Sequence, residues 1–371
     1  MDHERERARM IDDLAALVEA ESPTGDIDAT GRCADVLSAI SLDRLGVAPE
    51  RLDLNGTVAL RWQFPPASPT PPASPTPPAS PAPPASPAPP ASPTTLLVGH
   101  LDTVWPIGTL AEIPFAVDGD RITGPGCFDM KAGIVQGIHA LASLDDSQRA
   151  GVTFIITSDE ETGSKHSRTF IEDHARAARA ALVLEPSADG ALKTGRKGVS
   201  MYTLVVHGRS AHAGLEPENG ANALIEMAAQ VLAIPALARP EVGTTVTPTV
   251  ASAGTTTNSV PELARVAIDV RATSAEEQQR IDAALHALLP TIDGTRLVLE
   301  GAPNRPPLAE DMAAALFERA SALAAQLGHP PLKGVAVGGG SDGNFTAGVG
   351  TPTLDGLGAV GDGAHARHEW A

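Results

Sequence analysis

Four side chains of the kind that binds metal ions or transfers protons lie at the ends of short apolar segments. His100 ends TTLLVGH, Glu160 and Glu161 end VTFIITSDEE, and Glu185 lies in ALVLEP. Such segments are typical of buried parallel strands, whose carboxyl ends meet at one edge of an open α/β sheet. One residue of this kind alone is more often a solvated strand cap. Three segments that bring such residues to the same edge predict a metal or acid–base site.

Two aspartates can complete this site. Asp102 lies two residues after His100, so an extended backbone points both side chains to the same side. Its carboxylate can orient a metal-binding imidazole or hold another group of the site, and the alternative is a turn-forming role. Asp129 follows the glycine-rich bend GPGCF, where the backbone can approach a ligand closely and a carboxylate could bridge two cations. The alternative for Asp129 is the cap of a helix that begins near Met130.

Glu160 and Glu161 are adjacent, and two carboxylates so close would repel each other in a bare loop. The conflict is relieved if one binds metal while the other remains a general base, although the residues alone do not tell which has which task. Two divalent ions bring a charge of +4, and Asp129, Glu161 and Glu185 bring −3, so a bridging hydroxide would neutralise the cluster. Because metal coordination lowers the pKa of water to about 7, this arrangement predicts hydrolysis.

The elements that must position these residues form an alternating α/β pattern. Helices are predicted for KAGIVQGIHALASL, after Asp129, and for SRTFIEDHARAARAA, after Gly163. The first residues of the chain predict an amphipathic surface helix with Ile11, Leu14 and Leu17 on one face. The fold class expected from this alternation is α/β.

The pattern changes between about Gly195 and Arg305. Four strand-like segments are separated there by two helical ones: GVSMYTLVVHG, ANALIEMAAQVLAIPAL, TTVTPTVASAG, ARVAIDVRA, AEEQQRIDAALHALL and TRLVLEG. This order predicts a compact α+β unit with both helices on one face, inserted into the first domain. We therefore expect a catalytic domain of residues 1–194 and 306–371 and an inserted domain of residues 195–305.

Composition narrows the possible partners. The 371 residues suggest about two domains, and 45 acidic against 27 basic residues give a formal charge of −18, which repels nucleic acid and anionic membranes. Cys33 and Cys127 are far apart and form no CxxC, so we expect neither a disulfide framework nor a thiolate zinc site. With no signal peptide and no apolar stretch of about 20 residues, a cytoplasmic location is expected.

A proline-rich segment separates two strand-like segments. Between residues 65 and 94 the unit PPASP(T/A) repeats five times and holds 15 of the 33 prolines, which excludes a helix or a central strand. PxxP segments can bind aromatic grooves, but no Lys or Arg flanks these repeats. We expect a passive low-complexity insert in a loop between neighbouring strands.

Seven motifs occur in the order and approximate spacing of one enzyme family. They are GHLDTVWPIGTL, GPGCFDMKAG, TSDEETGS, LEPS, GRSAHAG, TNSVPELARVAIDVR and DGLGAVGDGAHA. The chain therefore resembles the co-catalytic zinc exopeptidases and deacylases, the family of glutamate carboxypeptidase, aminoacylase, succinyl-diaminopimelate desuccinylase and acetylornithine deacetylase. The resemblance covers nearly the whole chain outside the insert. It implies a phosphorylase/hydrolase-like catalytic domain with a mixed, mostly parallel sheet and a ferredoxin-like lid and dimerisation domain.

The resemblance also implies a metal-ligand set. Asp129 would bridge two divalent ions, His100 and Glu185 would complete one site, and Glu161 and His365 would complete the other. The metal implied is Zn²⁺, and Co²⁺ or Mn²⁺ would suit the same donors. In such enzymes a cis peptide follows the bridging aspartate.

His365 is preferred over His368 because GxGxH is the family's form. It lies six residues before the last residue of the sequence, and so terminal a segment is expected to be loosely held.

Catalytic roles follow from the same resemblance. Glu160 would be the general base and acid for a metal-bound hydroxide that attacks the amide carbonyl, with Asp102 supporting the site. His212, in SAHAG, matches a histidine that reaches the active site of the partner subunit in a homodimer and helps to stabilise the oxyanion.

Substrate-binding roles are implied for five further residues. Asn258 in TNSVP and Arg271 in DVR match lid residues that contact the substrate, and their amide and guanidinium suit a carboxylate. The alternative for Arg271 is a plain salt bridge within a strand. Arg305 in NRPPL matches a residue that binds the terminal carboxylate of the substrate, or it has a hinge role. Gly340 and Ser341, in GGGSDGNF, resemble the wall of the substrate pocket.

The motifs look most like those of glutamate carboxypeptidase. We expect a metallo-exopeptidase that hydrolyses an amide bond in an N-acyl amino acid or short peptide with a free carboxylate. The nearest alternative is a biosynthetic deacylase of the acetylornithine or succinyl-diaminopimelate type. An alternative from another class is a non-catalytic peptide-binding relative, against which the intact Glu160 and five candidate ligands argue.

Overall fold

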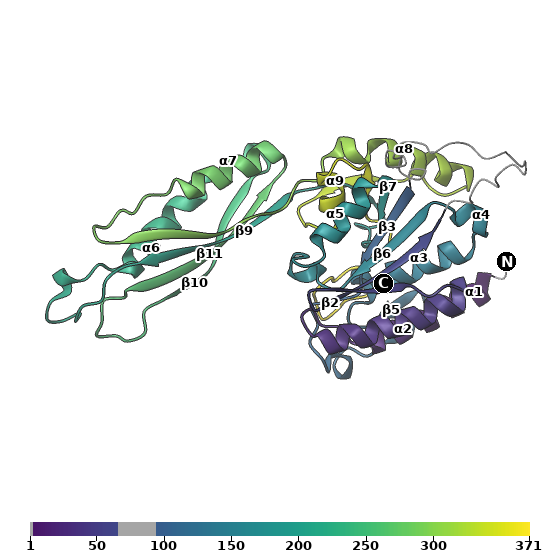
Figure 1. Cartoon of the computed structure of the whole chain (residues 1–371), viewed down its shortest axis with the longest axis horizontal. Helices are drawn as coiled ribbons and strands as arrows, with labels where there is room; N and C mark the ends of the chain where they lie inside the picture. The colour runs from purple at the N-terminus through teal and green to yellow at the C-terminus, as the bar shows by residue number, and fades with distance from the viewer. Residues whose placement is uncertain (1–2, 66–93) are drawn as a thin grey trace, which may run out of the picture. The chain divides into compact units, whose positions relative to one another are not determined.

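The computed structural model describes residues 3–65 and 94–371, so the proline-rich insert lies outside the described residues apart from its two ends. The chain forms two compact units (Figure 1). Unit 1 comprises Met1–Leu192, Leu316–Lys333 and Val349–Ala371, and unit 2 comprises Lys193–Ala315 and Gly334–Gly348. The predicted division into a catalytic domain of residues 1–194 and 306–371 and an inserted domain of residues 195–305 remains a prediction.

Unit 1 is built on a six-stranded sheet in the order β1-β2-β6-β3-β7-β14. Its strands are β1 (Glu50–Leu54), β2 (Thr57–Phe64), β3 (Thr94–His100), β6 (Val152–Thr157), β7 (Ala178–Val183) and β14 (Thr353–Leu354). Strands β6, β3, β7 and β14 are parallel neighbours, and β1 and β2 add an antiparallel edge. The predicted α/β class with a mixed, mostly parallel sheet is confirmed.

Three helices of unit 1 pack together with the sheet (Figure 1). They are α1 (His3–Glu19), α2 (Ile27–Leu45) and α3 (Ala132–Ala142), and the remaining helices that lie wholly in this unit are α4 (Asp146–Arg149) and α5 (Arg168–Arg176). Helix α8 (Glu310–Gln326) begins in unit 2 and ends in unit 1. Leu14 and Leu17 of α1, Leu37 of α2 and Ile134 of α3 share one buried core with Trp62 and Phe154 of the sheet.

Helix α5 is shorter than predicted. The helical pattern of SRTFIEDHARAARAA continues beyond Arg176, but the helix ends there and β7 begins at Ala178. The reason is the parallel pairing of Ala178 with Thr94 of β3, since backbone pairing inside a sheet outweighs the local helix propensity of alanine.

Unit 2 contains an antiparallel sheet in the order β10-β11-β9-β12. Its elements are β9 (Gly198–His207), α6 (Ala223–Ala233), β10 (Thr245–Ala253), β11 (Leu263–Ala272), α7 (Ala275–His286) and β12 (Arg296–Arg305). Alternate residues of β9, Tyr202, Leu204 and Val206, share a core with Met227 of α6 and Ile281 of α7. Both helices therefore cover one face, and the predicted ferredoxin-like β-α-β-β-α-β unit is confirmed.

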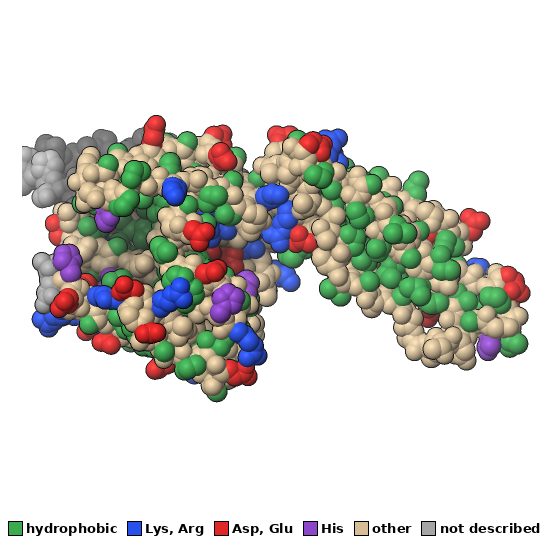
Figure 2. Space-filling model, turned by 180° about the vertical axis from the view of Figure 1, so that it is seen from behind, with side chains coloured by type: hydrophobic (Ala, Val, Ile, Leu, Met, Phe, Trp, Pro, Cys, Tyr) green, Lys and Arg blue, Asp and Glu red, His purple; other side chains and the backbone are tan. Residues whose placement is uncertain are grey.

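Smaller elements complete the two units. Unit 1 holds the hairpin of β4 (Ala116–Asp118) and β5 (Arg121–Thr123), and the pair β8 (Leu192–Arg196) and β13 (Gly334–Val337) precedes α9 (Gly343–Gly348). Figure 2 shows hydrophobic side chains gathered over the face of unit 2 that is turned to the viewer. In the described part of the chain, every helix is too short or too polar to cross a bilayer.

Candidate metal centre

The predicted strand-end residues gather at one edge of the sheet in unit 1. His100 is the last residue of β3, Glu160 and Glu161 follow β6, and Glu185 follows β7. These three strands are parallel neighbours, so their carboxyl ends meet as the sequence predicted. His100, Glu160 and Glu185 are buried. Chemically active groups from separate segments therefore share one enclosed place.

Asp129 lies between two histidines. Its Oδ1 is 3.5 Å from Nε2 of His100, and its Oδ2 is 3.4 Å from Nε2 of His365. Each histidine also faces a glutamate: Nε2 of His100 is 3.5 Å from Oε1 of Glu185, and Nε2 of His365 is 3.1 Å from Oε2 of Glu161. A carboxylate that offers one oxygen to each of two imidazole–carboxylate pairs has the geometry of a bridging ligand.

Two groups of potential ligand atoms result within the described residues. His100, Glu160 and Glu185 form one, Asp129, Glu161 and His365 form the other, and within each group the ligand atoms lie within 4.8 Å of one another. Glu160 thus belongs with the first group by position. This geometry allows Glu160 to act on a group bound there, whereas Glu161 lies on the side of His365.

Asp102 connects several parts of the centre. Nδ1 of His100 lies 3.0 Å from the carbonyl oxygen of Asp102 and 3.3 Å from its Oδ1. The carboxylate also accepts hydrogen bonds from the backbone N–H groups of Glu160 and Glu161, at 3.3 and 3.2 Å, and from the hydroxyl of Thr24 at 2.7 Å. With Nδ1 donating to Asp102, the lone pair of His100 lies on Nε2, which points at Asp129 and Glu185.

The electrostatics of the histidines reflect the carboxylates around them. Burial alone would lower the pKa of His100, but its contacts with Asp102, Asp129 and Glu185 outweigh this and hold the pKa well above its usual value. Contacts with Asp129 and a neighbouring glutamate raise the pKa of His365 to about 10. Burial opposes ionisation of Asp129, yet the two histidines hold the pKa of this carboxyl well below its usual range. The carboxylates around both imidazoles thus make this part of unit 1 favourable for positive charge.

For Glu161 the effect of burial on the pKa outweighs that of the neighbouring histidines. Burial raises the pKa of Glu161, and the contact with His365 offsets part of that rise. A carboxylate that is poorly solvated and lies beside a second carboxylate is stabilised by a cation. This supports a cation on the His365 side of the centre.

The turn that carries Asp129 is shaped by glycine and by a buried lysine. Gly126 has a φ of 73°, and a cis peptide joins Asp129 to Met130, as the resemblance implied. Helix α3 begins at Ala132, after Lys131, so Asp129 does not cap this helix. Nζ of Lys131 donates to the carbonyl oxygens of Leu17 at 2.8 Å and Ala20 at 3.3 Å, and burial lowers its pKa. Lys131 thus anchors the turn to α1.

Gly133 sets the distance between α3 and the segment after β7. A Cβ atom at this position would lie 2.0 Å from the carbonyl oxygen of Leu184, the residue before Glu185. Only glycine permits so close an approach, which fixes the backbone that carries Glu185.

The last residues of the sequence are held firmly, so the expectation of a loose terminal segment is wrong. Ala371 exchanges two backbone hydrogen bonds with Ile122 of β5, each 2.9 Å long. Trp370 pairs with Asp362 and lies under the guanidinium of Arg121, 4.1 Å from the ring centre. The segment that carries His365 is therefore fixed. His365 and His368 are both exposed, and it is His365 that contacts Asp129 and Glu161.

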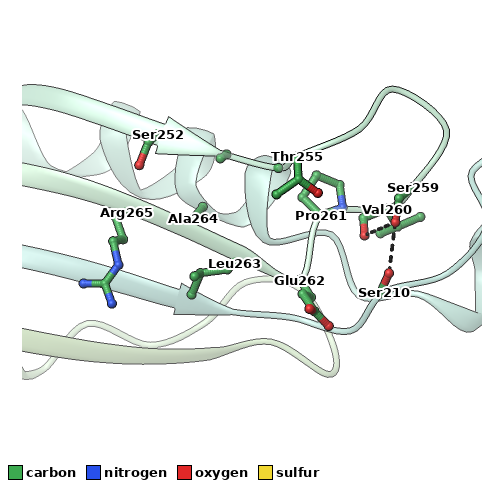
Figure 3. A pocket seen from close by; sticks show the side chains of 12 residues that line it. Ser210, Ser252, Thr255, Ser259, Val260, Pro261, Glu262, Leu263, Ala264 and Arg265 are labelled. Carbon is green, nitrogen blue, oxygen red and sulfur yellow. Dashed lines mark hydrogen bonds between the residues drawn. The ribbon is translucent and has the colours of Figure 1, made fainter.

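His212 and Asn258 lie in unit 2 and are brought together there. The N–H of Ala213 donates to the carbonyl oxygen of Asn258 at 2.9 Å, and His212 bridges to Ser259. Both predicted residues are exposed. The loop 254–262 borders a pocket at the ends of β10 and β11, where Ser210 and Ser259 are hydrogen-bonded at 2.9 Å (Figure 3). Two motifs far apart in the sequence thus form one surface of unit 2.

The other predicted substrate-binding residues also lie in unit 2. Arg271 forms a two-point ion pair with Asp269, at 2.9 and 2.8 Å, on the face of the sheet that the helices leave open. Arg305 is buried, and its Nε donates to the carbonyl oxygen of Ser341 at 3.1 Å. Gly340 packs against Arg305, because a Cβ atom there would lie 3.0 Å from the Cδ of that arginine. Their roles toward a substrate remain predictions.

Two residues of the centre were missed by the sequence analysis. Thr24 donates to Asp102, and Glu369 accepts hydrogen bonds from the turn that carries Asp129. Neither lies at a strand end or in a ligand-like spacing, so no signal in the single sequence distinguishes them.

The sheet edge with two groups of imidazole and carboxylate ligands, in a chain with an inserted ferredoxin-like unit, defines a class of protein: metal-dependent hydrolases with two adjacent cation sites. Residues 96–371 match the model of Peptidase family M20/M25/M40. The chain belongs to this family and is a hydrolase of the metallopeptidase type, which confirms the resemblance recognised in the motifs.

Individual similar proteins agree with this family membership. The chain is 32% identical over 283 residues to Carboxypeptidase G2 of Pseudomonas sp. (strain RS-16), covering 73% of this chain and 67% of that protein. It is 26% identical over 290 residues to a succinyl-diaminopimelate desuccinylase of Wolinella succinogenes, covering 74% and 78%. The YXEP protein of Bacillus subtilis, described as a dinuclear metal binding peptidase from the M20 family, superposes with a TM-score of 0.61 at 16% identity, covering 99% and 93% of the two chains.

Proposed function

We propose that this hydrolase cleaves the amide bond of an N-acyl amino acid or short peptide that carries a free carboxylate, in the manner of a glutamate carboxypeptidase. The observation that carries the proposal is the position of Asp129, whose two oxygens face two separate histidine–glutamate pairs. The similarity to Carboxypeptidase G2 supports the choice of substrate class.

The residues present fit a pair of divalent cations. Nε2 of His100 is buried and has no hydrogen-bond partner among the described residues, although three carboxylates surround it. A buried polar atom without a partner is costly, and a cation at this place would satisfy it and the carboxylates together. We propose that His100, Glu185 and Asp129 hold one ion and that Glu161, His365 and Asp129 hold the other. The bound ions would lower the pKa of water and polarise the substrate carbonyl.

We propose Zn²⁺ as the metal, since neutral imidazole and carboxylate are ordinary zinc ligands. Co²⁺ and Mn²⁺ suit the same donor set and serve as substitutes in tests.

Proton transfer is assigned to Glu160. It is buried beside His100 and Glu185, and its backbone N–H is held by Asp102, which fixes its place relative to the ligands. In this position Glu160 would take a proton from the attacking water and give it to the leaving amine.

We assign substrate contacts to unit 2. His212 would help to stabilise the oxyanion in a homodimer formed through this unit, and the exposed hydrophobic side chains there, among them Leu232 and Val250, support such an interface. Asn258, Arg271, Arg305, Gly340 and Ser341 would contact the substrate. We propose a cytoplasmic location, in keeping with two buried, unpaired cysteines, Cys33 and Cys127.

A biosynthetic deacylase is the second candidate, because desuccinylases are also among the relatives of this chain. Both activities use the same metal centre, so the substrate decides between them.

A release assay separates these activities. The protein is stripped with a chelator and reloaded with Zn²⁺ or Co²⁺. It is then offered folyl-glutamate, acetylornithine, succinyl-diaminopimelate and small dipeptides. We expect glutamate to be released from the folyl conjugate at the highest kcat/KM. Faster release of succinate or acetate would favour the deacylase, and no product from any substrate would refute the proposed function.

A further inference from the structure

Glu369 is a buried carboxylate that accepts four N–H groups. It is 1% exposed. Its Oε1 accepts the backbone N–H groups of Phe128 at 3.0 Å and Asp129 at 3.1 Å. Its Oε2 accepts the backbone N–H of Gly126 at 3.0 Å and the indole N–H of Trp105 at 2.7 Å. Burial raises the pKa of Glu369, and these donated bonds oppose the rise.

Three of the four donors belong to one turn. They are backbone groups of Gly126, Phe128 and Asp129, and this turn has a left-handed residue at Gly126 and is followed, after Met130, by the buried Lys131. Lys131 holds the far end of the turn to carbonyl oxygens at the end of α1. Glu369 therefore holds the near end of the turn, next to the backbone of Asp129.

The fourth donor extends the contact to a second segment of the site. Trp105 lies in the loop that follows His100 and Asp102, so Glu369 links this loop to the turn of Asp129. Glu369 itself is fixed, because its neighbour Trp370 pairs with Asp362 and Ala371 pairs with β5. A rigid support is what an orienting group needs, since a bridging carboxylate must present both oxygens at once.

We propose that Glu369 is a positioning residue of the metal centre: it holds the backbone of the turn so that the two oxygens of Asp129 face both cation sites. The inference rests on the proposed metal centre. Loss of the Glu369 contacts would leave three backbone N–H groups without acceptors, and the turn would shift to find water or other partners. Asp129 would then favour one cation site at the expense of the other.

A purely structural role is the alternative, and it makes a different prediction. A buried carboxylate that only stabilises the fold would change the unfolding of the metal-free protein and leave metal affinity as it was. Glu226 provides the matched control. It is buried in α6 of unit 2 and accepts the backbone N–H groups of Thr291 at 2.8 Å and Ile292 at 2.7 Å. No predicted metal ligand lies in that unit.

The test compares Glu369→Gln with Glu226→Gln in the full-length chain. In Glu369→Gln the amide nitrogen must face N–H donors on one side, so at least one pair of hydrogen bonds is lost while the volume is kept. Three quantities are measured for each variant: the dissociation constants for Zn²⁺ by chelator competition, the unfolding midpoint of the metal-free protein, and kcat and KM of the reloaded enzyme.

We expect Glu369→Gln to weaken binding of at least one Zn²⁺ by about 10- to 100-fold, the range found for groups that orient metal ligands. We expect kcat to fall with little change in KM. Glu226→Gln should lower the unfolding midpoint and leave both dissociation constants unchanged. Unchanged Zn²⁺ affinity in Glu369→Gln would overturn the inference, and so would an equal loss of affinity in both variants.

A second variant covers the case in which Glu369→Gln does not fold. Trp105→Phe keeps an aromatic ring and removes only the indole N–H that donates to Glu369. It should show a smaller loss of Zn²⁺ affinity in the same direction, and full affinity would overturn the inference. If the wild-type chain itself binds no Zn²⁺, the proposed function fails. If the wild type binds Zn²⁺ and the variants bind it with the same affinity, only the proposed role of Glu369 is refuted.

Discussion

Replacing Asp102 by asparagine tests how the centre is oriented without removing a ligand. The carboxylate accepts the N–H groups of Glu160 and Glu161 and the hydroxyl of Thr24, and its Oδ1 lies 3.3 Å from Nδ1 of His100. One oxygen of the carboxylate faces the N–H of Glu160 and Nδ1 of His100, and the other faces the N–H of Glu161 and the hydroxyl of Thr24. An asparagine must turn its NH₂ group toward one of these two pairs. In either orientation at least one backbone N–H loses its acceptor, and the negative charge that supports the imidazole is lost.

The magnitude follows from these contacts. A hydrogen bond to a charged group contributes about 1.5–3 kcal/mol, and about 1.4 kcal/mol corresponds to a tenfold change. Loss of one such contact from a group that orients His100 should therefore weaken metal binding by about 10- to 100-fold. The hydroxyl of Thr24 can rotate and donate elsewhere, so Thr24→Ala should have a smaller effect.

Chelator competition with Zn²⁺ measures this change. Asp173→Asn is the matched control, because Asp173 is an exposed carboxylate of α5 that forms an ion pair with Arg176, and exposed ion pairs contribute little. Asp102→Asn should lose affinity while Asp173→Asn keeps it. Wild-type Zn²⁺ affinity in Asp102→Asn would refute the view that Asp102 orients the site.

Four further predictions concern catalysis, protonation and packing. Glu160→Gln should lower kcat by about 10²- to 10⁴-fold, with retained metal content checked by elemental analysis, and a full hydrolytic rate would contradict its role as base. Metal binding at pH 8 should release a proton from His365, whose neighbouring carboxylates raise its pKa to about 10; calorimetry in two buffers of different ionisation enthalpy detects this proton, and no release would contradict the contacts of His365. The raised pKa of His365 stabilises the metal-free fold fully below about pH 6.5, and this stabilisation should be lost as the pH rises toward about 10, as a falling unfolding midpoint would show. Gly133→Ala should destabilise the protein by about 1–3 kcal/mol or more, because its Cβ would collide with the Leu184 carbonyl; an unchanged denaturation midpoint would exclude that collision.

Much of the site could be predicted because its residues follow strands. A parallel sheet brings the ends of β6, β3 and β7 to one edge. The position of a histidine or glutamate at this edge therefore follows from its place directly after an apolar segment. His100, Glu160, Glu161 and Glu185 were located in this way. Asp129 and His365 lie in turns, where no periodicity fixes a direction. The glycine-rich bend suggested Asp129 with a helix cap as the alternative, and the family motifs were needed to choose between these roles and to select His365.

Other features could not be predicted because they depend on contacts between distant parts of the chain. The bond from Gly126 to Glu369 joins residues 243 positions apart, and the bond from Thr24 to Asp102 joins residues 78 apart. Side-chain hydrogen bonds of this kind leave no repeating pattern in the sequence. The end of α5 at Arg176 was missed for a related reason, since pairing of Ala178 with β3 overrides the local propensity.

The most direct test of the account is the number of metal ions that each chain binds. The protein is stripped of metal, titrated with Zn²⁺ and followed both by bound metal and by amide hydrolysis, for the wild type and for Asp129→Asn. The wild type should bind two ions per chain and regain activity, whereas Asp129→Asn should bind both ions more weakly, because its side chain faces both histidines. A single ion in the fully active wild type, or two tightly bound ions in Asp129→Asn, would contradict a centre bridged by Asp129.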